Sequence, residues 1–139
     1  MIYDAGFTIP VSKHAYVRLI DELRPKFSTI KSILDIGVGT GAALYEIIDQ
    51  IPKNISITGI DIDENYHNNA KELFKEYPNV NIRLQDLYEL ENSTERYDVL
   101  ISGYSIMLMP DQAKALQIMR SLLNPGGKIY FLMTLYEEK

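Results

Sequence analysis

Three glycines at alternate positions, in "GVGTG" (37–41), constrain this chain more than any other feature. An apolar run, "SILDI" (32–36), precedes them, and a segment with apolar residues at helical spacing follows. A plain turn between a strand and a helix needs only one glycine, whereas alternating glycines let a ligand lie against bare backbone. The sequence therefore predicts a strand, a ligand-binding loop and a helix, in that order.

Patterns typical of strands and helices alternate along the rest of the chain, with Pro, Gly or Asn at their boundaries. This alternation predicts an α/β fold, a doubly wound and mostly parallel sheet with helices on both faces. We expect strands at 32–37, 55–61, 79–86, 97–103 and 128–136, and helices at 16–23, 43–51, 66–77 and 110–123.

Composition narrows the class of protein. The 139 residues are enough for a single domain, 1–139, with no repeat or low-complexity linker. A net charge of −5 without a basic block argues against nucleic acid as a direct partner. There is no cysteine, no membrane-spanning apolar run and no signal-peptide pattern, so we expect no membrane insertion and a cytoplasmic location.

Two classes of ligand fit the glycine loop. The pattern Gly37-x-Gly39-x-x-Ala42, with Asp61 about 20 residues on, matches a dinucleotide fingerprint. S-adenosylmethionine (SAM), which has an adenosine but no phosphate, also fits. Asp35 distinguishes the two, because a carboxylate at the mouth of the strand repels a pyrophosphate and attracts the ammonium and sulfonium of SAM. At an effective dielectric constant of roughly 20, one charge pair at about 4 Å contributes roughly 4 kcal/mol before desolvation.

Four motifs in order resemble those of class I SAM-dependent methyltransferases, over about residues 30–134. They are "LDIGVGTG", "GIDID", "LQDLYEL" and "LLNPGGKIYF". The resemblance implies a Rossmann-like core (30–139) with strand order 3-2-1-4-5, SAM as the cofactor and S-adenosylhomocysteine (SAH) as its product. It implies a cofactor site that contains Asp35, Gly37, Val38, Gly39, Thr40 and Gly41 at the methionine end, Asp61 and Ile62 at the ribose, Asp86 and Leu87 at the adenine, and Ser102, Gly103 and Tyr104 at the reacting end.

Ordinary structural roles compete with several of these assignments. Asp86 at the end of a strand is also typical of a turn, whereas Asp63 is available to cap the helix that follows Asp61. The segment 1–29 resembles the lid that many family members fold over SAM, and Lys13, His14 or Tyr16 could serve there. An ordinary N-terminal helix is the favoured explanation for each of them. Met107, Leu108 and Met109 could line an apolar pocket, although core packing is the commoner use of Met.

The function that we expect is methyl transfer from SAM to a small-molecule or lipid-like acceptor. The Asp/Asn-Pro-Pro-Tyr/Phe motif of amino-methylating nucleic-acid enzymes is absent after the strand at 97–103. Methyl transfer needs orientation more than a protein nucleophile, so we name no catalytic residue, and we name no metal ligand. A non-catalytic SAM-binding partner subunit is the alternative, and a nicotinamide-dependent oxidoreductase is the third.

The strand expected at 128–136 is apolar almost throughout, which is typical of a strand with neighbours on both sides. The family fold usually continues beyond this strand with a helix and a strand pair, and the sequence lacks them. We therefore expect a C-terminally truncated fold whose fifth strand is an exposed edge. Such an edge would favour aggregation, or a homo-oligomer in which another chain covers it.

Overall fold

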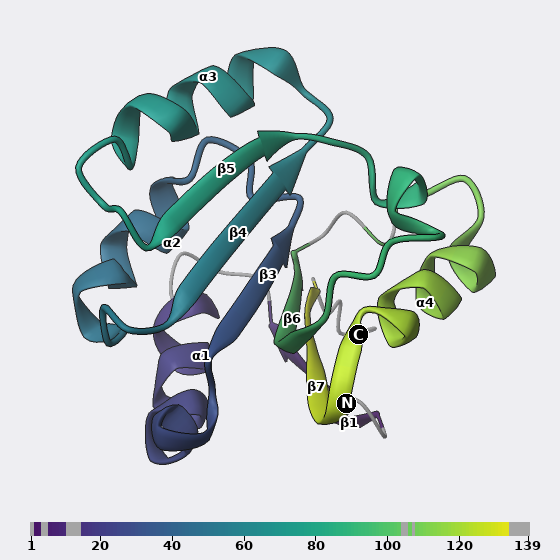
Figure 1. Cartoon of the computed structure of the whole chain (residues 1–139), viewed down its shortest axis with the longest axis horizontal. Helices are drawn as coiled ribbons and strands as arrows, with labels where there is room; N and C mark the ends of the chain where they lie inside the picture. Colours follow the sequence, from purple (N-terminus) through teal and green to yellow (C-terminus); the bar gives the residue numbers. More distant parts are fainter. Residues whose placement is uncertain (1, 4–5, 11–14, 104–105, 107, 134–139) are drawn as a thin grey trace, which may run out of the picture.

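The five strands expected from the sequence form one parallel array in the computed structural model, which describes residues 2–3, 6–10, 15–103, 106 and 108–133 (Figure 1). Their spatial order is β7-β6-β3-β4-β5, which is the expected order 3-2-1-4-5 seen from the other end. The α/β fold class predicted from the sequence is therefore confirmed. The bounds are β3 Ser32–Ile36, β4 Ser56–Asp61, β5 Val80–Leu84, β6 Tyr97–Gly103 and β7 Leu123–Met133.

Two further strands from the N-terminal segment extend the sheet beyond β7. Strand β2 (Gly6–Pro10) runs parallel to β7, with Thr8 opposite Phe131 and Ile9 opposite Leu132. Strand β1 (Ile2–Tyr3) pairs with β2 in the antiparallel direction. The expectation of an exposed edge at the fifth strand is therefore wrong. An apolar strand needs neighbours on both sides, and the start of the same chain supplies the second one.

The "NPGG" segment interrupts the pairing of β7 with β6. Tyr97 pairs with Leu123, but Val99 pairs with Lys128, so β7 advances five residues while β6 advances two. Gly126 in this stretch has φ +81°, which favours glycine. The expected turn thus exists, as an irregularity within β7 rather than before it.

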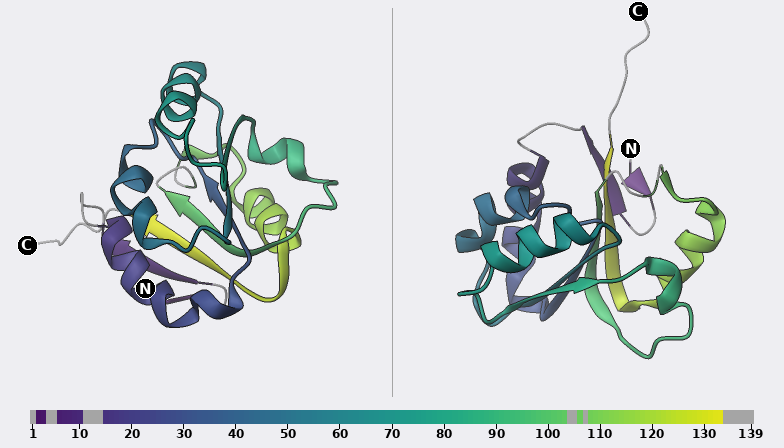
Figure 2. Two further views of the ribbon diagram at one scale, coloured as in Figure 1. Left: turned by 60° about the vertical axis from the view of Figure 1, so that its left-hand side comes forward. Right: turned by 90° about the horizontal axis from the view of Figure 1, so that it is seen from above.

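Helices cover both faces of the sheet (Figure 2). Helices α1 (Ala15–Leu23), α2 (Ala42–Ile47) and α3 (Glu64–Leu73) pack on one face, and α4 (Gln112–Ser121) packs on the other. Short 3₁₀ turns are η1 (Arg24–Thr29), η2 (Ile48–Gln50) and η3 (Leu87–Leu90). Two apolar cores result, one centred on Leu19, Ile33, Leu44, Ile57 and Ile101, the other on Leu34, Leu100, Ala115, Met119 and Ile129.

Side-chain caps explain where two of the helices begin. Asp63 accepts a hydrogen bond of 3.0 Å from the backbone N–H of Tyr66 at the start of α3, as expected from the sequence. Asp111 accepts one of 3.0 Å from Lys114 at the start of α4. Because β3, β4 and β6 are parallel, their carboxyl ends meet at one edge of the sheet, and the glycine loop lies there.

Candidate cofactor-binding site

The backbone of the glycine loop is left-handed at each of its three glycines. The φ angles are +75° at Gly37, +63° at Gly39 and +83° at Gly41. Any other residue would be strained at these positions, which explains the alternate spacing. The backbone N–H groups of Gly37 and Val38 both donate to the carbonyl oxygen of Ile60, at 2.8 and 3.1 Å. These two hydrogen bonds tie the loop to the carboxyl end of β4.

The surroundings of two of these glycines differ. A Cβ atom added to Gly39 would have no heavy atom of the described residues within 4 Å, so this face of the loop is open. A Cβ atom added to Gly41 would lie 2.9 Å from Cε2 of Phe74 and 3.2 Å from Cβ of Ala70. Gly41 therefore permits close packing of α2 on α3, whereas Gly39 can accept a ligand against its backbone.

Asp61, the last residue of β4, fastens the open part of the loop. Its Oδ2 accepts a hydrogen bond of 2.8 Å from the N–H of Gly39, and its Oδ1 accepts one of 2.9 Å from the N–H of Asp63. The side chain is half-buried, and each oxygen retains a further lone pair. The neighbouring side chain of Ile62 is 73% exposed, so a carboxylate and an apolar surface lie together at this edge.

Asp35 is fully buried in β3, two residues before the loop. Oδ2 accepts a hydrogen bond of 2.9 Å from the hydroxyl of Tyr16, and Oδ1 accepts none from the residues that the structure describes. Burial raises the pKa of Asp35 to about 7, against the opposing effect of the Tyr16 hydrogen bond, and the negative charge of Asp61 raises it further. The site therefore contains a buried carboxyl group with one oxygen available to a donor.

Gly103, at the end of β6, lies beside the glycine loop and Tyr16. A Cβ atom added there would lie 3.8 Å from the carbonyl oxygen of Gly37 and 3.9 Å from the hydroxyl of Tyr16. The glycine loop, α1 and β6 thus converge above Asp35. Tyr104, the next residue assigned to the site from the sequence, lies outside the described residues, as do Lys13, His14 and Met107.

Ser102 faces away from this cluster. It pairs with Ile36 and Phe131, which belong to the core on the α4 face of the sheet, whereas Asp35 faces α1. The side chain is fully buried, and Oγ has no hydrogen-bond partner among the described residues. Ser102 and Asp35 are therefore close along the sheet but on opposite faces of it.

Asp86 caps the turn that follows β5. Its Oδ1 accepts a hydrogen bond of 3.1 Å from the N–H of Tyr88, and its own N–H donates one of 2.8 Å to Oε1 of Glu89. This is a capping box, so the turn-forming explanation holds for Asp86. The cap leaves Oδ2 able to accept from an amino group. The side chain of Leu87 is buried in the α4-side core, so only its backbone can face a ligand.

Two other residues of the loop have structural roles. The side chain of Val38 is buried and packs against the backbone of Gly59, where an added Cβ would lie 3.2 Å away. Thr40 is exposed, and its Oγ1 accepts a long hydrogen bond of 3.4 Å from the N–H of Ala42. Neither side chain reaches Asp35 or Asp61 through a hydrogen bond that the structure records.

Tyr16 is the site residue that sequence reasoning undervalued. It lies on the apolar face of α1 with Leu19, Ile20 and Leu23, and the same spacing predicts an ordinary core residue. Its hydroxyl is the only feature that distinguishes it, because a buried tyrosine hydroxyl requires a partner. In the segment that follows β6, Leu108 is 85% exposed, and Met109 is half-buried against the core on the α4 face.

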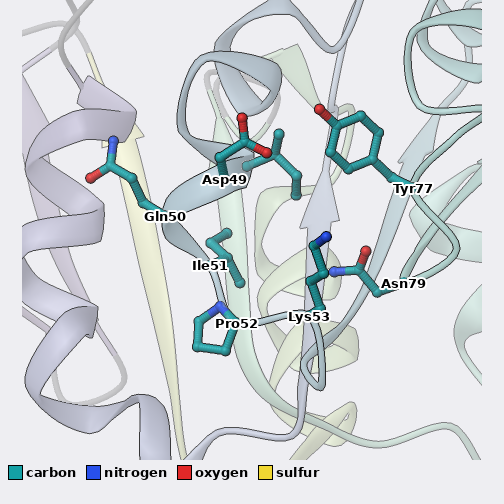
Figure 3. Close-up of a pocket in the computed structure, with 8 residues that line it drawn as sticks. Asp49, Gln50, Ile51, Pro52, Lys53, Tyr77 and Asn79 are labelled. Carbon is teal, nitrogen blue, oxygen red and sulfur yellow. The ribbon is translucent and has the colours of Figure 1, made fainter.

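A hollow with a volume of about 300 Å³ lies at the other edge of the sheet. Figure 3 shows side chains around it that include Asp49, Lys53, Tyr77 and Asn79. Lys53 precedes β4 and Asn79 precedes β5, so the hollow adjoins the amino ends of the strands. It is separate from the glycine loop, and it contains none of the cofactor residues assigned from the sequence.

The described part of the chain contains no cluster of three or more His, Cys, Asp or Glu side chains that could hold a metal ion. None of the helices within residues 15–103 and 108–133 is long and apolar enough to cross a membrane.

Comparison with protein families gives a match to the family described as "Methyltransferase domain", over residues 28–135. Among curated proteins, arsenite methyltransferase of Mus musculus is 33% identical over 110 residues, 71% of this chain and 29% of that protein. Malonyl-[acyl-carrier protein] O-methyltransferase 1 of Ilyobacter polytropus is 34% identical over 100 residues, 72% of this chain and 37% of that protein. The chain thus spans well under two thirds of these relatives.

Solved structures agree with the fold. The plantazolicin methyltransferase BpumL, in complex with a triazolic desmethylPZN analog and SAH, matches with a TM-score of 0.68 and 27% identity. That match covers 81% of this chain and 43% of the other. The CurJ carbon methyltransferase matches with a TM-score of 0.63 and 28% identity, over 70% of this chain and 27% of the other.

A parallel sheet of order 3-2-1-4-5, with a glycine loop after its first strand and an acid at the end of its second, is together with these matches the core of a class I SAM-dependent methyltransferase. The chain belongs to the methyltransferase domain family, as its motifs indicated. This assignment confirms SAM as the cofactor and argues against the nicotinamide-dependent alternative. The hydrogen-bond acceptors of the site fit SAM. A buried carboxyl oxygen with no partner among the described residues suits an ammonium, and a half-buried carboxylate suits a ribose diol.

Proposed function

We propose that the protein binds SAM across the carboxyl edge of the sheet and transfers its methyl group to a small organic acceptor. The observation that carries this proposal is the open backbone of Gly39, held at 2.8 Å by Asp61 beside the buried carboxyl of Asp35. A ligand that spans both carboxylates must be able to donate hydrogen bonds to each of them. SAM has an ammonium at one end and a ribose diol in the middle.

Each side chain of the site has a proposed role. Asp35 and the backbone of residues 37–41 hold the methionine end, with Val38, Thr40 and Gly41 shaping the loop. Asp61 holds the ribose, and the exposed side chain of Ile62 covers the adenosine. Oδ2 of Asp86 and the backbone of Leu87 meet the adenine. The backbone of Ser102, whose side chain faces the other side of the sheet, borders the reacting end together with Gly103 and Tyr104.

The proposed mechanism needs orientation rather than a protein nucleophile. SAM supplies a methyl group already activated by the sulfonium. The protein holds this end of the cofactor beside β6, where Gly103 leaves room near the Gly37 carbonyl. Fixing donor and acceptor in line removes most of the entropic cost of their encounter. The proposal therefore assigns no general base to a residue of this chain.

The acceptor class is a small organic molecule or a lipid-like one. Relatives of this chain are named for arsenite, for malonyl-[acyl-carrier protein] and for ubiquinone biosynthesis, so the core supports varied acceptors. A net charge of −5, with no basic block in the sequence, supports the absence of nucleic acid among the substrates. The lack of cysteine is compatible with the cytoplasm, which we keep as the proposed location.

A second candidate function is a SAM-binding unit that does not catalyse transfer alone. The chain spans 29% to 54% of the length of the curated relatives named above, so the acceptors of those proteins are not carried over to it. Both candidates require SAM binding, and they differ in turnover.

Titration calorimetry with SAM, SAH and NAD tests the binding step. We expect SAM and SAH to bind and NAD to bind more weakly or not at all. Tighter binding of NAD would overturn the proposed function. Release of SAH from labelled SAM, measured with pools of small acids, phenols and acyl thioesters, then separates an enzyme from a binding unit.

A further inference from the structure

A hydrogen bond joins the N-terminal helix to the cofactor site. The hydroxyl of Tyr16, in the first turn of α1, donates to Oδ2 of Asp35 over 2.9 Å. The Tyr16 side chain is 9% exposed and that of Asp35 is 0% exposed, so water does not weaken this contact. The contact orients the carboxyl group, and it leaves Oδ1 without a partner among the described residues.

Few other groups in the described structure control the charge of Asp35. Tyr16 faces it from α1, and Asp61 acts on it from β4. On the strands packed beside it, its register neighbours are Gly59 of β4 and Ile101 of β6, which do not titrate. Tyr130 of β7 lies on the same face, one strand beyond Ile101. Tyr16 is therefore the hydrogen-bond donor that supports the ionised form of this carboxyl.

We propose that Tyr16 is a positioning residue that presents Oδ1 of Asp35 to the ammonium group of SAM. This inference rests on the proposed function, and it adds a residue outside the four motifs to the site. The hydroxyl acts on the ammonium through Asp35, because it donates its hydrogen bond to Oδ2 of that carboxyl group and so orients Oδ1. SAM binding is then coupled to the packing of α1 against the sheet.

SAM binding should also release a proton from Asp35. Asp35 has a pKa of about 7, so it is largely protonated in the slightly acidic range when no cation is present. Binding of an ammonium favours the ionised form, and the proton is released. The affinity for SAM should therefore fall as the pH drops below about 7, towards tenfold per pH unit. Loss of the Tyr16 hydroxyl should move this fall to higher pH.

The test is titration calorimetry of wild type and Tyr16→Phe from about pH 5.5 to about pH 8.5, a range that spans the transition. Three ligands are used: SAM, SAH and 5′-methylthioadenosine, which has the adenosine and sulfur but no ammonium. We expect Tyr16→Phe to bind SAM and SAH about tenfold more weakly near pH 7, with the deficit shrinking as the pH rises. Binding of 5′-methylthioadenosine should not change.

Tyr97→Phe is the matched control. Its hydroxyl also donates to a carboxylate, Oε1 of Glu95 at 2.8 Å, but at the amino end of β6. This variant should keep the wild-type affinity for all three ligands. Asp35→Asn should bind SAM weakly at every pH, without the wild-type pH dependence. Amide exchange of α1 should slow on SAM binding in wild type and less so in Tyr16→Phe.

The outcomes separate this inference from the function on which it rests. If wild type binds neither SAM nor SAH, the proposed function itself fails. If wild type binds SAM but Tyr16→Phe has the same affinity and pH profile, only the role of Tyr16 is refuted. An equal loss for 5′-methylthioadenosine, or a deficit independent of pH, would mean that Tyr16 only supports the fold.

Discussion

The backbone N–H of Gly39, in the loop after β3, donates a hydrogen bond of 2.8 Å to Oδ2 of Asp61, at the end of the neighbouring strand β4. The other oxygen of Asp61 accepts from the N–H of Asp63 at 2.9 Å. Asp61 therefore holds the glycine loop before any ligand arrives. A residue assigned to ribose binding from its sequence position is also a structural support of the loop.

The first prediction is that Asp61→Asn is a damaging substitution. Whichever way the amide is turned, its NH₂ group faces one backbone N–H, of Gly39 or of Asp63, and cannot accept from it. We expect a loss of roughly 1–3 kcal/mol in the free energy of unfolding and a more than tenfold loss of SAM affinity. Urea unfolding and calorimetry measure the two effects. Asp61→Ala should weaken SAM binding at least as much.

Asp63→Asn is the control for this prediction. It makes the same chemical change two residues further on, at a position where Asp63 caps α3 by accepting from Tyr66. Asn caps helices about as well as Asp, so stability and SAM affinity should hardly change. Equal behaviour of Asp61→Asn and Asp63→Asn would refute the double role of Asp61.

The second prediction contrasts two glycines of the loop. Both have positive φ, which costs alanine about 1–2 kcal/mol. Gly41→Ala also places Cβ 2.9 Å from Phe74 and 3.2 Å from Ala70, so its total cost should reach roughly 3 kcal/mol. The Cβ of Gly39→Ala has no heavy atom of the described residues within 4 Å, so this change should cost less stability but more SAM affinity. Thermal unfolding without ligand, followed by SAM titration, tests both; the reverse ranking in stability would contradict the packing role of Gly41.

The parts of the site that lie next to each other in a parallel sheet could be predicted from the sequence. Alternating strand and helix patterns place the carboxyl ends of β3, β4 and β6 at one edge, so Gly39, Asp61 and Gly103 had to lie close together. The caps formed by Asp63 and Asp111 also follow from local chemistry. These features depend on periodicity and short-range hydrogen bonds, which a sequence displays directly.

Long-range pairings of short segments could not be predicted in the same way. The contact of Tyr16 with Asp35 depends on how α1 is seated, and its spacing matches a core residue equally well. Strand β2 has five residues and pairs with the opposite end of the chain. Its short apolar pattern does not identify a partner, so the covering of β7 was missed.

The third prediction concerns pH and the buried carboxyl of Asp35. Its pKa is about 7 in the folded protein, against 3.8 ordinarily, so folding favours the protonated form. The contribution of protonated Asp35 to the free energy of unfolding is complete below about pH 4 and is lost as the pH rises through about 7. Asp35→Asn removes this dependence. The free energy of unfolding of Asp35→Asn should therefore rise by roughly 2–3 kcal/mol, relative to that of wild type, between pH 5 and pH 8.

Urea unfolding of both proteins at the two pH values, without ligand, measures this change. All other titrating groups are shared, so their effects cancel in the difference. A difference between wild type and Asp35→Asn that stays constant from pH 5 to pH 8 would show that Asp35 titrates normally.

The last prediction concerns the pairing of β2 with β7. Thr8 lies opposite Phe131 and Ile9 opposite Leu132, and consecutive N–H groups of a strand point to opposite sides. Replacing both Thr8 and Ile9 by Pro therefore removes the N–H that faces β7, whichever residue supplies it. The apolar edge of β7 would then be exposed, and we expect concentration-dependent association by light scattering and faster amide exchange in β7. The double variant with Ala at both positions keeps the N–H groups and should behave like wild type. If the Pro variant remains a monomer with β7 protected, the edge is secured by something other than β2.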